Sequence, residues 1–289
     1  MNNSNRNAIL ALASAGALWG LTVPLSKLAL GWLAPAWLTV ARFVLAAPAL
    51  ALLGRRGLRA ACSPSVAAAG ALGFGGVVVL QNAGIEHTSV SHAAVLLGAV
   101  PVLVALFTAA RSGWAGYALA MGGVALIADS GGGGSTMLGD GLVLASAVLS
   151  AGFITVQPRL LAGRDAAAVT AVQLAAGALF ALPIAALSGP APHIPASAGP
   201  VAALLALAVA GTLLPFWLFA HGQAQVPASL AGAFVNLEPV IGAAVGWLAF
   251  GNPAGPWQLL GVAAVITGIG LSALPPRQRG RHRAVAWGG

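Results

Sequence analysis

The chain has 289 residues, of which 59% are hydrophobic and only 6% are charged, and its mean hydropathy is +0.92. Soluble domains carry about 25% charged residues, so this composition excludes a soluble globular protein and indicates an integral membrane protein. A net charge of +8 would suggest nucleic-acid binding in a soluble chain. Here the basic residues are expected in loops that set membrane orientation. The one cysteine, Cys62, excludes an internal disulfide.

Ten apolar segments of about 20 residues, the length that spans a bilayer, follow one another along the chain. The first is too long for the core of a signal peptide and is interpreted as a spanning helix. Gly131 to Gly134 form a flexible linker, and a polar, arginine-rich tail begins at Pro275. The segments are 8–30, 34–54, 64–83, 89–110, 113–129, 138–158, 166–187, 198–220, 228–250 and 256–274.

Basic residues lie in every second connection between these segments. With the N-terminus inside, the inner connections and tail hold all of the 13 Lys and Arg residues except Lys27 and Arg42. This is the positive-inside pattern. It predicts a multi-pass protein of the bacterial inner membrane with both termini in the cytoplasm.

A shift of the sequence by 138 residues aligns its two halves without a gap. Each half holds five segments, and an odd number forces the second copy to be inverted. We therefore predict an all-α fold of ten transmembrane helices: a repeat in 1–130, a linker in 131–137, an inverted repeat in 138–275 and a cytoplasmic tail in 276–289. Inverted repeats around a midplane site are typical of secondary transporters. Coinciding pairs include Gly73 with Gly211, Gly84 with Gly222, Pro101 with Pro239 and Gly123 with Gly261.

Four short motifs occur in order along these segments. They are Leu18-Trp19-Gly20-Leu21-Thr22-Val23-Pro24 followed by Lys27, then Ala41-Arg42-Phe43, Ala99-Val100-Pro101 and Leu237-Glu238-Pro239. With the duplication, they make residues 8–275 resemble the EamA family of the drug/metabolite transporter superfamily. The resemblance implies a ten-helix inverted-repeat fold and export of small metabolites, with amino-acid exporters prominent among bacterial members.

Two ionisable residues fall inside segments, Glu238 near the middle of the ninth and Arg42 in the second. A charge at the bilayer centre costs roughly 2.5–3.5 kcal/mol on insertion scales, so such residues are functional candidates. Glu238 is expected either to meet a substrate ammonium or proton, or to pair with Arg42 or a freed backbone donor. Asn236 lies about 200° around the helix from Glu238 and is a candidate hydrogen-bonding group.

Pro101 and Pro239 occupy equivalent positions in the two halves. Each frees the carbonyl four residues earlier, on Leu97 and Val235. Broken helices near the midplane bind substrate in inverted-repeat transporters, although either proline can also be a simple kink.

Two turns related by the repeat are predicted as opposite gates. His92, at the start of the fourth segment, is a further candidate cavity residue that could carry a proton. A lone histidine is more often an interfacial group with its hydrogen bonds satisfied. The outer gate turn contains Asn82, Gly84 and Glu86, and the inner one contains His221, Gly222 and Gln223. Gln81, at the start of the outer turn, is a candidate cavity residue.

No P-loop, catalytic motif or Cys/His cluster is present, so the sequence predicts neither ATP hydrolysis nor a cofactor, metal or enzyme. The expected partners are a small-molecule substrate and the lipid bilayer, not nucleic acid. The leading hypothesis is an amino-acid exporter with a cavity lined by the first, third, fourth, sixth, eighth and ninth helices. Trp19 and Trp217 are expected to line that cavity or to pack against core or lipid. The alternatives are efflux of lipophilic cations, which the absence of a carboxylate in the first segment disfavours, and a membrane enzyme.

Overall fold

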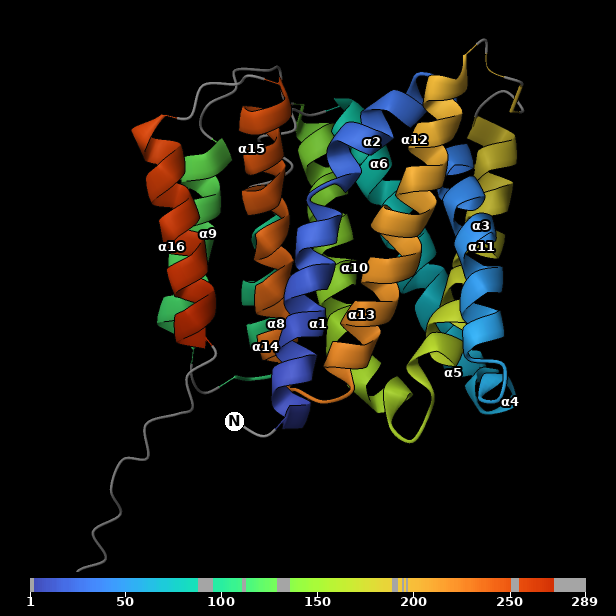
Figure 1. Ribbon diagram of the computed structural model, residues 1–289, viewed down its shortest axis with the longest axis horizontal. Coiled ribbons are helices and arrows are strands. Elements are labelled where there is room, and N and C mark those ends of the chain that lie inside the picture. The colour runs from blue at the N-terminus through green and yellow to red at the C-terminus, as the bar shows by residue number, and fades with distance from the viewer. Residues whose placement is uncertain are drawn as a thin grey trace, which may run out of the picture.

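The computed structural model describes residues 3–87, 96–110, 113–128, 136–188, 192–193, 195, 197–250 and 255–272 (Figure 1), and all regular secondary structure within them is helical. This confirms the predicted all-α class. Five helical stretches in that part of the chain are long and apolar enough to cross a bilayer. They are Pro35–Leu53, Pro64–Gly84, Met137–Leu161, Ala166–Ser188 and Ala198–Gln223.

Several helices run without a break. Local signals set their starts: Pro35 takes the first turn of α3, where its missing N–H costs nothing, and the Thr136 hydroxyl accepts from the Gly139 amide at 3.1 Å to cap α10. These helices are α3 (Pro35–Leu53), α9 (Trp114–Ala128), α10 (Met137–Leu161), α11 (Ala166–Ser188) and α16 (Pro256–Ser272); α4 (Leu58–Ala61) and α8 (Val100–Phe107) are short.

Four other stretches are divided near their middles. The divisions in α5–η1–α6 and α12–η2–α13 are both π-helical, and they start at Ala71 and Val209, which coincide under the 138-residue shift. Single π-turns inside helices occur frequently at functional sites. The divided stretches are α1 (Asn3–Trp19) with α2 (Thr22–Leu30), α5 (Pro64–Gly70) with η1 (Ala71–Gly76) and α6 (Val77–His87), α12 (Ala198–Ala208) with η2 (Val209–Leu213) and α13 (Leu214–Gln223), and α14 (Ala228–Ala233) with η3 (Phe234–Asn236) and α15 (Leu237–Phe250).

The break between α1 and α2 lies at Gly20 and Leu21. Pro24 cannot donate to the Gly20 carbonyl, four residues earlier. At the same break, the Thr22 hydroxyl donates to the carbonyl of the neighbouring residue Trp19 at 2.6 Å. A Cβ at Gly20 would lie only 2.9 Å from the Glu238 carbonyl oxygen, so glycine lets the break lie directly against α15.

The antiparallel pair α9 and α16 forms one end of the molecule, and α3 with α11 forms the other (Figure 1). Gly123 and Gly261 meet in a reciprocal contact, since a Cβ on either would lie 2.6 Å from the carbonyl oxygen of the other. Gly116 meets Gly268 in the same way, so the register runs antiparallel. Small residues allow this close approach of two membrane helices.

Two further helix contacts are equivalent in the two halves. Gly84 of α6 faces α10, where its added Cβ would lie 3.1 Å from the Gly139 carbonyl oxygen. Gly222 of α13 faces α1, where the distance to the Ala8 carbonyl oxygen would be 3.0 Å. The molecule therefore repeats one packing contact at two places.

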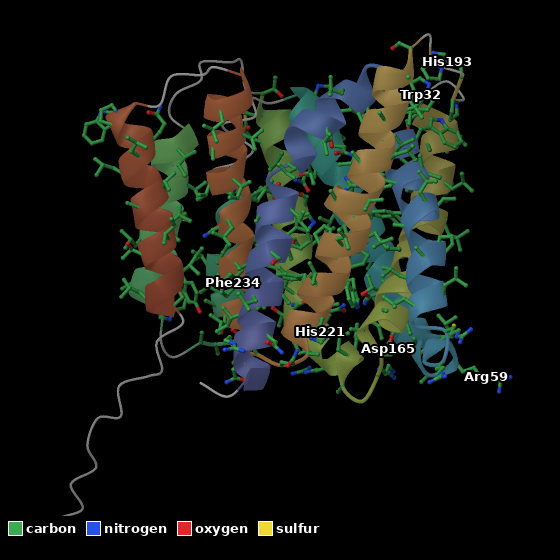
Figure 2. All side chains as sticks on the ribbon, viewed as in Figure 1. Trp32, Arg59, Asp165, His193, His221 and Phe234 are labelled. Carbon is green, nitrogen blue, oxygen red and sulfur yellow. The ribbon has the colours of Figure 1, made fainter. Side chains whose placement is uncertain are left out.

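Residues predicted for the outer and the inner connections lie at opposite ends of the helices (Figure 2). Trp32 and His193 lie at one end of the helices, where the Trp32 indole N–H donates to the His193 carbonyl at 2.5 Å. Arg59, Asp165 and His221 lie at the opposite end. The main hydrophobic core lies between these ends and contains Leu12, Phe43, Ala147, Leu174 and Phe219.

Candidate functional site

A cavity of about 1230 Å³, counted out to its open mouth, lies in the middle of the helices. Every element that was predicted to line it contributes: α1–α2, η1–α6, Leu97 with α8, α10, α13, and η3–α15. Arg42 of α3 also lines it. Both halves of the chain therefore form its walls.

The cavity lies against the breaks in the helices. Thr22 follows the break in the first segment, and Gly73 and Phe74 belong to η1. Pro101 and Pro239 have no N–H to donate to the carbonyls of Leu97 and Val235. Leu97 and Val235 both line the cavity. The helix breaks thus bring irregular backbone to the cavity wall, where polar groups can be used for binding.

Arg42 is 5% exposed and is held by the second π-turn. Its Nε donates to the Thr212 hydroxyl at 2.7 Å, and its Nη2 donates to the Gly211 carbonyl at 2.7 Å. The Thr212 hydroxyl donates onward to the Leu207 carbonyl at 3.1 Å. η2 therefore fixes the guanidinium at the cavity wall, and these contacts connect α3 of one half to α12–α13 of the other.

Glu238 lines the same cavity from the start of α15. Its charge and that of Arg42 attract each other, but there is no direct ion pair between these two described side chains. Within the described residues, Arg42 Nη1 also has no protein hydrogen-bond partner. Among the described residues that line it, the cavity therefore has one acidic and one basic side chain, and these two do not form a direct ion pair.

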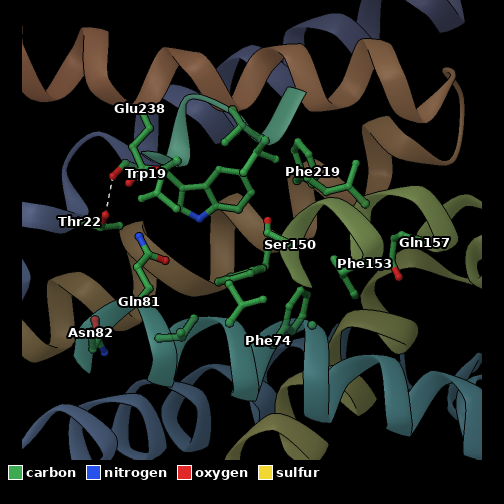
Figure 3. Close-up of a pocket in the computed structure, with 18 of the residues that line it drawn as sticks. Trp19, Thr22, Phe74, Gln81, Asn82, Ser150, Phe153, Gln157, Phe219 and Glu238 are labelled. Atoms are coloured by element: carbon green, nitrogen blue, oxygen red, sulfur yellow. Dashed lines mark hydrogen bonds between the residues drawn. The ribbon is translucent and has the colours of Figure 1, made fainter. Parts of the chain in front are cut away.

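The two ends of the cavity differ in polarity (Figure 3). Glu238, Thr22, Gln81 and Asn82 lie toward one end. Phe153, Phe219 and Gln157 lie toward the other, with Trp19 between the two groups.

The two ends also differ in exposure. Ser26 and Gln81, toward the α2 end, are partly exposed, whereas Ile154, Gln157 and Gln223 at the other end are buried. Gln223 is 1% exposed, and its Nε2 donates across to the Ile154 carbonyl of α10 at 3.2 Å. The cavity is therefore closed at the C-terminal end of α13.

Some of the predicted gate residues have structural contacts of their own. Asn82 lines the cavity and donates to the Thr39 hydroxyl at 3.2 Å, holding α6 to α3. His221 is exposed, and Gln225 donates to its carbonyl at 3.0 Å. Gly84 and Gly222 serve the packing contacts described above.

The structure brings together part of the predicted set. Trp19, Arg42, Gln81 and Glu238 line the cavity, and Asn82 and Gln223 of the gate turns line it too. Pro101, Trp217, Asn236 and Pro239 are not among its lining residues. His92 and the side chain of Glu86 lie outside the described residues.

Two of the predicted residues that do not line the cavity lie elsewhere in the protein interior. Trp217 packs against the main hydrophobic core. Asn236 is 1% exposed, and its Nδ2 has no hydrogen-bond partner within the described structure.

The aromatic lining was missed by sequence reasoning. Phe74, Phe153, Phe216 and Phe219 look like ordinary lipid-facing or core residues in apolar segments, because only tertiary packing decides which way they point. Gln157 did carry a signal, since it is a polar residue inside the sixth segment.

Broken helices around a central cavity are typical of secondary transporters. The EamA-like transporter family model matches residues 6–128 and again residues 137–274. The chain belongs to this family, which confirms the resemblance found in the sequence.

Two relatives align along almost the whole chain. A probable terminal-alkyne amino-acid exporter of Streptantibioticus cattleyicolor is 31% identical, covering 96% of this chain and 96% of its own. An uncharacterized transporter of Archaeoglobus fulgidus is 26% identical, over 96% of this chain and all of its own length (100%). A solved crystal structure, 19% identical, has a TM-score of 0.81 over 92% of this chain and 96% of its own, and it supports the fold.

Proposed function

We propose that this chain is a secondary transporter that exports amino acids or closely related small metabolites across the bacterial inner membrane. The observation that carries the proposal is the presence of Arg42 and Glu238 in one cavity, not joined to each other directly. An amino acid carries one negative and one positive group and can satisfy both. Family membership and the amino-acid exporter among the relatives support this assignment.

Binding uses the charges that the protein leaves unpaired. Glu238 accepts the substrate ammonium, and Nη1 of Arg42 donates to the carboxylate. Trp19 lies between the polar and aromatic ends (Figure 3), where its ring can face the ammonium in a cation–π contact. Charge-assisted hydrogen bonds of this kind contribute about 1.5–3 kcal/mol each.

The fold is proposed to be ten transmembrane helices in two inverted five-helix repeats, joined by 131–137. Three features support it: the family model matches each half, η1 and η2 start at equivalent positions, and Gly123 meets its equivalent Gly261 reciprocally. A reciprocal contact between equivalent residues is what a two-fold relation produces. Antiparallel packing of these equivalent helices supports the inversion of one repeat relative to the other.

Transport is proposed to proceed by alternating access, with the described state closed at the inner end. The Gly84 and Gly222 contacts exist at both ends at once, so they fit fixed packing better than gating. The Gln223 contact with Ile154 joins α13 to α10 at the closed end alone. We assign it as the inner gate contact, and closure of the outer end would bring α6 toward the break at Gly20 and Leu21.

The function is tested by reconstituting the purified chain into proteoliposomes and measuring counterflow of labelled amino acids, with and without a pH gradient. Saturable uptake that depends on the protein supports the proposal. Uptake of lipophilic cations with no response to any amino acid would contradict it and favour multidrug efflux.

A further inference from the structure

We propose that the aromatic end of the cavity is a subsite for the substrate side chain, and that it selects neutral, apolar side chains over polar or charged ones of the same length. This inference rests on the proposed function, because it takes the charged head of the substrate to lie at the Arg42 and Glu238 end. It adds to the proposed function the residues that select the substrate side chain, which are Phe74, Phe153, Phe216 and Gly73.

Packed aromatic rings form this end. Phe74 lies 4.7 Å from Phe153 and 4.3 Å from Phe216 between ring centroids, and Trp19 closes the group with its ring 5.5 Å from Phe216 and 5.0 Å from Phe219. The rings come from α1, η1, α10 and α13. Because all of these residues line the cavity, a side chain entering it meets apolar surface on several sides.

The glutamine side chains at this end offer a substrate no accessible free group. The carboxamides of Gln157 and Gln173 donate to each other, at 2.9 Å and 2.7 Å, and both residues are buried. The Oε1 of Gln223 has no hydrogen-bond partner, but it has almost no exposed surface, so a substrate cannot reach it in this state. The Ser150 hydroxyl also lines the cavity here, so a polar or charged end group would lose its water and gain at most this one side-chain partner, which is unfavourable.

Gly73 controls the shape of this end. A Cβ on Gly73 would lie 2.5 Å from Cγ of Phe153, a separation that atoms do not tolerate. Glycine in η1 therefore lets the Phe153 ring lie close against the π-turn, within the cavity wall. A larger residue at 73 must push the ring toward the space that the substrate side chain fills.

The first measurement compares matched pairs of amino acids in the wild-type chain. Norleucine and lysine differ in the charge at the end of one chain, and methionine and glutamine differ in its polarity. Binding to the detergent-purified protein by calorimetry and counterflow in proteoliposomes are measured separately. We expect norleucine and methionine to bind at least about tenfold more tightly than their polar counterparts.

The second measurement changes the shape of the subsite. Gly73→Ala should weaken binding of phenylalanine at least about tenfold, while alanine, whose side chain does not reach the rings, is affected little. Adding Phe153→Ala should restore phenylalanine binding, because it removes the ring that Gly73→Ala displaces. Gly152→Ala is the matched control, since an added Cβ there meets nothing within 4 Å.

The outcomes separate this inference from the proposed function. Binding of norleucine over lysine without transport supports the subsite and overturns the transport proposal. Transport that does not distinguish the pairs, or a Gly73→Ala loss that is equal for alanine and phenylalanine, overturns the subsite and leaves the proposed function standing. If no amino acid binds or is transported, both are wrong.

Discussion

At the scale of single residues, Glu238 and Arg42 differ in the protein contacts that hold their side chains. Glu238 lies in the first turn of α15 and lines the cavity. The positive charge of Arg42 attracts it, but the two described side chains form no direct ion pair. Arg42, in contrast, is held by Thr212 and Gly211. The Arg42 guanidinium is therefore fixed in position, whereas the Glu238 carboxylate is available to a ligand.

Glu238→Gln is expected to fold normally and to lower the initial rate of amino-acid transport at least about tenfold. The reason is the loss of one charge-assisted hydrogen bond, about 1.5–3 kcal/mol, while the size and the polarity of the side chain are kept. Rates are measured in proteoliposomes from pH 5 to 8 and normalised to folded protein. Wild-type rates at every pH would leave Glu238 with a structural role only.

At the scale of helices, glycine at 123 and 261 permits the contact that joins α9 to α16. Gly123→Ala should lower the melting temperature of the purified protein, because its Cβ would lie 2.6 Å from the Gly261 carbonyl oxygen and overpacking costs about 1–3 kcal/mol. Gly122→Ala is the control, since its Cβ meets nothing within 4 Å. Equal melting temperatures for the two variants would show that α9 and α16 do not pack in this register.

The contact between α13 and α10 gives a test of gating. Gln223→Glu places a charge at a position that is 1% exposed, and burying an unpaired carboxylate costs several kcal/mol. We expect the inner end to open, so that a probe cysteine at Ser150 in a Cys62→Ser background reacts at least about tenfold faster with impermeant reagents from the cytoplasmic side.

Gln225→Glu is the matched control for this experiment, because it adds the same charge two residues away at a partly exposed position. It should leave labelling of the probe unchanged. Equal labelling in the Gln223→Glu protein and the control would remove Gln223 from the gate.

At the scale of the whole molecule, the arrangement of charges predicts the orientation in the membrane. In a Cys62→Ser background, a cysteine at Met137 should react with an impermeant reagent from outside the cell, and a cysteine at Arg56 should react only after the membrane is opened. Met137 is 94% exposed and Arg56 is exposed, so neither is shielded by protein. The reverse labelling pattern would overturn the predicted topology.

The sequence by itself determined the membrane class, the all-helical secondary structure and the family. These depend on local composition and on order along the chain: apolar length, loop charge, and motifs such as that around Glu238. It also indicated Arg42 and Glu238, because a charge inside an apolar segment is costly wherever the helix lies.

Tertiary structure decided the rest, because a nearly uniform apolar segment does not show which of its faces meets the cavity. It placed Phe74 and Phe153 in the cavity wall and packed Trp217 against the hydrophobic core. It also gave Arg42 its partners in η2, a π-turn that depends on how α12–α13 packs against α3. Such contacts join residues about 170 positions apart, and only the packed fold brings these residues together.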